Sequence, residues 1–246
     1  MQVKSLVAAK RKRLSRLGTR KLYFKLQPDF RAQGIKLGRD KLFSIMREFD
    51  LLVRPRRRHV QTTMSQHNLR KYPNLIKDLK LETCEQVWVS DITYIKTQEG
   101  TCYLNLVTDA YSRRIMGYAL EPNMEAASMM KALKMAFRQR LYPENETIHH
   151  SDRGKQYCSN KYVELATGNK MKMSMTQDSD PYENALAERM NRTLKEEFGL
   201  GKTLKNRQQA ETLVKEAVEL YNNHRPHLSL QMKTPQQVHQ IKIPAC

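Results

Sequence analysis

Two carboxylates that are far apart in the chain constrain its fold more than any other feature. Asp152 follows the short run Ile148-His149-His150-Ser151, and thirty-five residues separate it from Glu188. Acids at that distance cannot meet on one helix. They can share a site only if a tertiary fold brings them together.

The segment around Glu188 is predicted to be a helix. Asp180 can cap its start, Pro181 suits the first helical position, and Glu183 stands where a capping box has its return partner. Spacings of four, three and four then place one polar stripe on it: Asn184, Glu188, Asn191 and Lys195. A neighbouring apolar stripe consists of Ala187, Met190, Leu194 and Phe198. We therefore expect one flank to pack and the other to present the carboxylate.

The charge is concentrated in one third of the chain. The net charge is +19. Residues 1–80 carry 22 Lys and Arg against 5 Asp and Glu, whereas the remaining 166 residues carry 22 against 20. This asymmetry favours a polyanionic partner, with nucleic acid ahead of membrane.

Nothing in the sequence indicates a membrane or a secretory pathway. No apolar run approaches the roughly 18 residues needed to span a bilayer. The amino end has Lys10-Arg11-Lys12-Arg13 where a signal peptide would be cleaved. The four cysteines form neither a CxxC pair nor a disulfide framework. We expect a cytoplasmic protein.

The basic amino-terminal third is predicted to be helical. Gly18 and Gly34 separate short amphipathic segments, the last of which carries Leu42, Ile45, Met46 and Phe49 at helical spacing. Such a unit fits a helix-turn-helix that binds DNA. Arg54-Pro55-Arg56-Arg57-Arg58 ends the unit as a basic linker able to follow phosphates.

From residue 87 the pattern changes to mixed α/β. Strands are predicted at 87–95, 103–108, 114–120, 147–151 and 171–175, and helices at 126–140, 160–167 and 208–222. The first three strands suggest an antiparallel meander. A helical crossover would then place the fourth strand parallel to the first.

If the first and fourth strands are neighbours, Asp91 on the first lies beside Asp152 at the end of the fourth. The helix can then deliver Glu188 opposite them. Three clustered carboxylates need a compensating cation, and oxygen ligands select Mg²⁺ or Mn²⁺. Two such ions can activate an attacking oxygen and stabilise a leaving one at phosphorus.

Four motifs give the chain a resemblance to a known family. They are Trp88-x-x-Asp91-Ile92-Thr93-Tyr94, Asp109-Ala110-Tyr111-Ser112-Arg113-Arg114, the run from His149 to Tyr157, and Glu183-Asn184-Ala185-x-Ala187-Glu188. Together they resemble the integrase core of bacterial insertion-sequence transposases. The match covers about residues 85–240 and points to OrfB-type enzymes of the IS-three family, relatives of retroviral integrases. The tail from Tyr221 to Leu230, with Thr234-Pro235, is similar to that family's tail.

The resemblance implies a ribonuclease-H-like sheet of five mixed strands flanked by helices, preceded by a small all-α region. It implies that Asp91, Asp152 and Glu188 are catalytic and bind two Mg²⁺ ions, which Mn²⁺ can replace. It also implies Mg²⁺-dependent cleavage at the ends of an insertion sequence and transfer of the freed 3′-hydroxyl to a new phosphodiester.

The same resemblance implies a set of partners. They are double-stranded DNA, both terminal repeats and target, further copies of the chain on that DNA, and an upstream OrfA-type protein, in a nucleoid-associated bacterial enzyme. We expect the following DNA contacts: Lys195, Asn184, Asn191, Arg192, Arg54, Arg56, Arg57, Arg58, Arg39 and Lys41. The expected regions are 1–58 for DNA binding, 59–86 as connector, 87–200 as catalytic core and 201–246 as a helix and tail packed on the core.

Some features depart from the family pattern or leave alternatives open. Glu188 is followed by Arg189-Met190-Asn191, where many members have Ser and two aromatics, and the zinc module of retroviral integrases is absent. A nuclease of the same fold that cuts without joining remains an alternative, as does a DNA-binding regulator with an inactive core. A tyrosine recombinase is disfavoured because no Tyr follows Tyr221. The sequence leaves the role of Arg225 and His227 open between packing and DNA contact.

Overall fold

The structure is a computed structural model that describes residues 2–53, 68–177 and 185–241. The predicted linker arginines Arg54, Arg56, Arg57 and Arg58 lie outside these residues, as do Asn184 and the predicted helix cap. Within the described ranges, no helix combines the length and apolar character needed to cross a bilayer.

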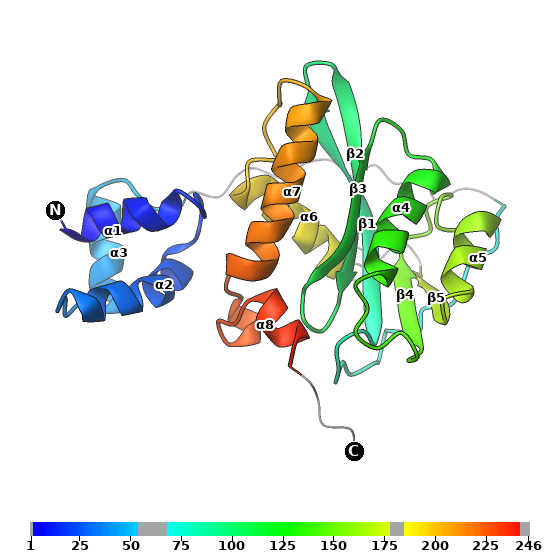
Figure 1. Cartoon of the computed structure of the whole chain (residues 1–246), viewed down its shortest axis with the longest axis horizontal. Coiled ribbons are helices and arrows are strands. Elements are labelled where there is room, and N and C mark those ends of the chain that lie inside the picture. Colours follow the sequence, from blue (N-terminus) through cyan, green and yellow to red (C-terminus); the bar gives the residue numbers. More distant parts are fainter. Residues whose placement is uncertain (1, 54–67, 178–184, 242–246) are drawn as a thin grey trace.

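Three helices form the amino-terminal unit, which we define as residues 2–53. They are α1 (Gln2–Arg11), α2 (Thr19–Ala32) and α3 (Arg39–Glu48). Leu22 and Leu26 of α2 and Leu42 and Met46 of α3 are fully buried between them. The helical spacing of these apolar residues explains why the segments pair into a small bundle. Figure 1 shows this unit beside the main body of the molecule.

A five-stranded sheet forms the main body, with the order β3-β2-β1-β4-β5. Its strands are β1 (Val87–Thr97), β2 (Gly100–Asp109), β3 (Ile115–Glu121), β4 (Thr147–Ser151) and β5 (Met171–Met175). β1, β2 and β3 pair antiparallel, whereas β4 runs parallel to both β1 and β5. The predicted meander and the parallel placement of the first and fourth strands are confirmed.

Helices cover both faces of this sheet (Figure 1). One face packs α4 (Ala126–Phe137) and α5 (Asn160–Thr167), and the other packs α6 (Ala185–Glu197) and α7 (Arg207–His224). The tail adds a 3₁₀ turn, Leu228–Leu230, and the short helix α8 (Pro235–His239). The mixed, helix-flanked sheet expected from the sequence is thus the observed architecture.

Side-chain alternation along β1 assigns its residues to the two faces. Ile95 joins the cluster that contains α6 and α7 residues, whereas Trp88 and Ile92 join the cluster on the α4 and α5 side. Asp91 has the same parity as Ile95, so it points to the α6 side. The strand therefore directs this carboxylate toward the helix that carries Glu188.

β3 and α4 approach each other at backbone distance. A Cβ built on Gly117 of β3 would lie 2.0 Å from the carbonyl oxygen of Ala132 in α4. No side chain fits in that space, so glycine is required at this position of β3. The close contact sets the distance between α4 and the sheet.

A buried polar cluster anchors the tail to the core. His239 of α8 lies 3.0 Å from Ser112 Oγ through Nδ1 and 3.3 Å from Glu85 Oε1 through Nε2. Asp109 accepts hydrogen bonds from the backbone N–H groups of Ser112 and Glu85. These contacts join the segment before β1, the β2–β3 turn and α8.

The same cluster places ligand atoms of Cys84, Asp109 and His239 within 4.8 Å of one another. Both oxygens of Asp109 are already engaged, Oδ1 by Ser112 and Oδ2 by the Glu85 N–H. His239 also has a pKa raised to about 10: burial opposes this shift, and hydrogen bonds to Asp109, Cys84 and Glu85 outweigh the burial. A protonated histidine therefore occupies the position that a cation would need.

Candidate active site

The register of β1 and β4 aligns the two aspartates. Val87 pairs with Ile148 and Val89 pairs with His150. The same offset, continued two residues beyond the last pair, sets Asp91 opposite Asp152. Neighbouring strands lie about 4.8 Å apart, so the two carboxylates emerge side by side.

The first turn of α6 brings Glu188 to this pair. Ala187 is buried against Val89 of β1, which fixes the start of the helix over the strand. Glu188 itself is exposed, and its charge is among the causes that raise the pKa of Asp91. The structure thus brings together the three acids that the sequence singled out.

The electrostatics of the two aspartates reflect crowding of negative charge. Burial, the charge of Asp152 and, to a lesser extent, that of Glu188 raise the pKa of Asp91 to about 7, against hydrogen bonds from Ile92 and Asn191. Burial also raises the pKa of Asp152, which the hydrogen bond from Gly154 partly offsets. Clustered acids of this kind bind a proton or a cation at neutral pH.

Local hydrogen bonds hold each aspartate in place. Asn191 Nδ2 donates to Asp91 Oδ2 at 2.7 Å, and the Gly154 N–H donates to Asp152 Oδ1 at 3.0 Å. A Cβ on Gly154 would lie 2.9 Å from that same oxygen. The Asp-x-Gly turn was a sequence signal for this second contact, because Asp side chains accept from the backbone two residues on. We had not predicted a role for Gly154.

Asn191 requires a correction. The sequence predicted a DNA contact there, but its side chain is 6% exposed and its amide binds Asp91. Asn191 lies about one turn after Glu188 on α6, on the side of the helix that faces β1. Its side chain therefore points toward the sheet, whereas Glu188 is exposed. The residue connects α6 to β1 rather than facing solvent.

The other predicted DNA contacts in the described residues are distributed over two regions. Arg192 on α6 is exposed, as are Arg39 and Lys41 at the start of α3. Arg39 pairs with Asp40 at 2.9 Å. Lys195 is partly buried: burial lowers its pKa, and the charge of Asp91 acts in the opposite direction. Lys195 is therefore close enough to Asp91 for the two charges to interact.

The histidines near the acids bind neighbouring hydroxyl groups. His149 Nε2 lies 3.0 Å from Ser90 Oγ and 2.9 Å from the Tyr162 hydroxyl. His150 Nδ1 lies 2.9 Å from Ser174 Oγ. Both side chains are fully buried. These contacts give both histidines a structural role.

Arg225 and His227, which the sequence left open, pack the tail. Arg225 is 5% exposed and donates two hydrogen bonds to the carboxylate of Glu197, at 2.7 and 2.6 Å. Its Nη1 lies 2.9 Å from His227 Nε2. The pair attaches the tail to the carboxy-terminal end of α6.

Known families match most of this main body. An integrase core domain family matches residues 84–181, and a second integrase core domain family matches residues 169–235. In fold, the chain is similar to the HTLV-2 integrase catalytic core domain in complex with magnesium, with a TM-score of 0.51 and 17% identity over 64% of this chain and 98% of that one. It is also similar to a chain of the simian T-cell lymphotropic virus intasome, with a TM-score of 0.58 and 15% identity over 93% of this chain and 73% of that one.

Two bacterial relatives match at higher identity. The insertion element IS600 uncharacterized 31 kDa protein of Shigella sonnei is 37% identical over 222 residues, which cover 89% of this chain and 81% of that protein. The transposase InsF for insertion sequence IS3A of Escherichia coli (strain K12) is 32% identical over 205 residues, 82% of this chain and 71% of that protein.

These matches identify a class and then a family. The fold and the matching core define a polynucleotidyl transferase of the transposase and integrase class, with a ribonuclease-H-like catalytic core. The chain belongs to the IS3 family of insertion-sequence transposases, as the resemblance in its motifs had implied.

Proposed function

We propose that this transposase cuts one DNA strand at each end of its insertion element and joins the freed 3′-hydroxyl to a phosphodiester of target DNA. One observation supports this more than any other: the β1 and β4 register aligns Asp91 with Asp152 where α6 presents Glu188. Three acids from separate segments meet over the middle of the sheet, where β4 ends beside the central strand β1. An arrangement of this kind suits chemistry at phosphorus.

The donor set fits hard divalent cations. The three acids offer only oxygen atoms, and the nearby His149 and His150 are turned to Ser90, Tyr162 and Ser174. We infer that Asp91, Asp152 and Glu188 hold two Mg²⁺ ions, for which Mn²⁺ can substitute. When bound, these ions supply charge stabilisation at the attacking and leaving oxygens.

The protein's own residues keep those ligands in position. Asn191 fixes Asp91 relative to α6, so that Asp91 and Glu188 keep a constant separation. The turn at Gly154 fixes Asp152 in the same way. We infer that Lys195, whose charge interacts with that of Asp91, contacts a phosphate of the DNA end. Fixed groups of this kind lower the cost of reaching the transition state.

The two steps balance without a covalent protein intermediate. In the first, the oxygen of water bonds to phosphorus and the bond from phosphorus to the 3′-oxygen breaks, leaving a 3′-hydroxyl on the element. In the second, that 3′-oxygen bonds to a target phosphorus and displaces the target's 3′-oxygen. The number of phosphodiester bonds is unchanged in the second step, so no external energy source is required.

We also infer the partners. The exposed Arg39 and Lys41 of α3 and Arg192 of α6 are available to duplex DNA, and the linker arginines extend this surface in sequence. Copies of the chain assemble on DNA, and an OrfA-type protein joins them. We assign DNA binding to 1–58, connection to 59–86, catalysis to 87–200, and packing of the core to 201–246.

Purified protein, Mg²⁺ and DNA carrying the terminal repeats that flank the gene provide the test. Wild type is expected to release a nicked end and then form joined products. Asp152→Asn and Glu188→Gln should abolish both while retaining DNA binding. Glu216→Gln, an exposed acid on α7, is the matched control and should remain active.

Each outcome separates the competing functions. Nicking by wild type without joining would identify a nuclease. DNA binding without either reaction would identify a regulator with an inactive core. Joining by Glu188→Gln at the wild-type rate would remove Glu188 from the proposed site.

A further inference from the structure

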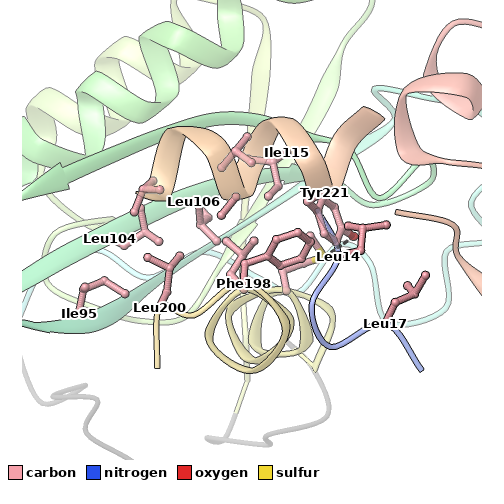
Figure 2. Packing of buried hydrophobic residues seen from close by; sticks show 14 of the residues in the cluster. Leu14, Leu17, Ile95, Leu104, Leu106, Ile115, Phe198, Leu200 and Tyr221 are labelled. Atoms are coloured by element: carbon pink, nitrogen blue, oxygen red, sulfur yellow. Dashed lines mark hydrogen bonds between the residues drawn. The ribbon is translucent and has the colours of Figure 1, made fainter. Parts of the chain in front are cut away.

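The amino-terminal unit is packed against the far end of the catalytic helix. Leu14 and Leu17 are 8% and 2% exposed and share a hydrophobic cluster with Phe198 and Tyr221. Figure 2 shows Leu14 next to Tyr221, with Phe198 close by at the end of α6. Ser15 Oγ adds a hydrogen bond to the Glu197 carbonyl oxygen at 3.4 Å. These contacts fix the unit relative to α6.

A cavity of about 360 Å³ opens at this contact. Arg16, Arg20 and Lys21 line it from the amino-terminal unit, and Glu196 and Glu197 line it from α6. Both oxygens of Glu197 already accept hydrogen bonds from the guanidinium of Arg225. The lining therefore contains three cationic side chains and two carboxylates, one of which is paired with Arg225.

Lys21 illustrates the excess of positive charge. Burial and, to a lesser extent, the neighbouring Arg225 lower its pKa to about 8, and the carboxylate of Glu197 only partly opposes them. An anion in the cavity would compensate this charge. The phosphate of a nucleic-acid backbone is an anion that clustered Arg and Lys side chains bind.

The exposed face of α6 connects the cavity to the acids. Glu188, Arg192 and Glu196 recur every four residues and so lie along one side of the helix. Glu188 and Arg192 are exposed, and Glu196 lines the cavity. Eight residues of α-helix span about 12 Å, which is the rise of about four base pairs at roughly 3.4 Å each.

We propose that this cavity holds a backbone phosphate of the element's DNA end, about three to five base pairs from the bond that the same chain cuts. The amino-terminal unit and α6 then form one continuous DNA-binding face, with Arg192 between the cavity and the acids. The proposal rests on the proposed function. It adds the place at which the DNA end is held and states that the chain that holds it is the chain that cuts it.

Neutral methylphosphonate substitutions, placed one at a time along the terminal DNA, locate the phosphate. Binding is measured for wild type, for Arg20→Ala and for Arg31→Ala, an exposed arginine on the same helix that does not line the cavity. In wild type and Arg31→Ala, one position three to five base pairs from the cut should weaken binding. In Arg20→Ala that position should have a clearly smaller effect, because only Arg16 and Lys21 remain, and the slope of log affinity against log salt concentration should fall by about 0.9.

The proposal would be overturned if Arg20→Ala changed the effect of a methylphosphonate only at a position more than ten base pairs from the cut, or at no position. Thermal unfolding of Arg20→Ala at the wild-type temperature would show that the fold is intact. Cleavage by wild type in the same reactions reports the proposed function separately, so the two can fail independently.

A mixing experiment tests whether the site acts within one chain. Arg20→Ala lacks the cavity contact, and Glu188→Gln lacks the third acid. An equimolar mixture should cleave no better than Arg20→Ala alone, because neither chain has both features. Cleavage restored toward wild type would place the phosphate site on a partner chain and refute the arrangement within one chain.

Discussion

Replacing His239 with Gln should destabilise the protein by an amount that depends on pH. His239 is fully buried between Glu85, Asp109 and Ser112, and it is the only group of α8 that reaches all three. The guanidinium of Arg140 lies 3.7 Å from Glu85, at Oε2, whereas His239 is at Oε1. Glutamine can keep a hydrogen bond in this position but cannot supply the positive charge.

The magnitude follows from the pKa of His239. Its folded value of about 10 lies above the ordinary value of 6.5, so protonated His239 stabilises the fold fully below about pH 6.5. This contribution is lost as pH rises toward 10. At about 1.36 kcal/mol per pH unit, a change from pH 7 to pH 9 removes about 3 kcal/mol. The full contribution is about 5 kcal/mol.

Lys21 titrates in the same window with the opposite sign. Its folded pKa of about 8 lies below the ordinary 10.5, so its effect on stability becomes more favourable as pH rises from 8 to 10.5. A pH profile of wild type alone would combine the two groups. The difference between wild type and His239→Gln cancels Lys21 and leaves the contribution of His239.

Urea unfolding of both proteins at pH 7 and pH 9 measures this difference. The variant should be less stable at pH 7, and the gap should narrow by about 3 kcal/mol at pH 9. A gap that stays the same at both pH values would refute the charged role of His239. In that case His239 would stabilise the tail only by packing.

Three further substitutions probe the sheet, the site and the DNA surface. Gly117→Ala should destabilise by about 3 kcal/mol or more, measured by urea unfolding, because its Cβ would overlap the Ala132 carbonyl; a wild-type midpoint would contradict the close packing. Gly154→Ala should slow cleavage more than it lowers stability, because the new methyl displaces the Asp152 oxygen that it meets at 2.9 Å; equal losses in both would argue against a positioning role. Lys41→Ala should reduce the salt slope of DNA binding by about 0.9, and an unchanged slope would remove Lys41 from the interface.

Most of the sheet was predictable because its signals are local or follow general rules. The fourth and fifth strands, Thr147–Ser151 and Met171–Met175, begin and end where the sequence predicted. The parallel pairing of β1 and β4 followed from the helical crossover between them. With the first and fourth strands as neighbours, Asp91 is expected beside Asp152.

The inward turn of Asn191 and the contacts of the tail could not be predicted in the same way. Helical spacing shows which polar residues share one side of α6, but it does not show which of them face the sheet. Asn191 is one that does. Glu85 and His239 are single polar residues more than 150 positions apart, with no local pattern to pair them. Only the completed fold brings such residues into contact.

The catalytic helix α6 connects these separate observations. Its amino-terminal turn presents Glu188 and, through Asn191, is bonded to Asp91 on β1. Its carboxy-terminal end is held by Arg225 of the tail and, through Phe198, by Leu14 of the amino-terminal unit. A displacement of the tail or of that unit therefore acts on the same rigid helix that positions the third acid. Because a helix transmits such a displacement along its axis, regions about 14 Å from Glu188 can set the geometry of the three acids without touching them.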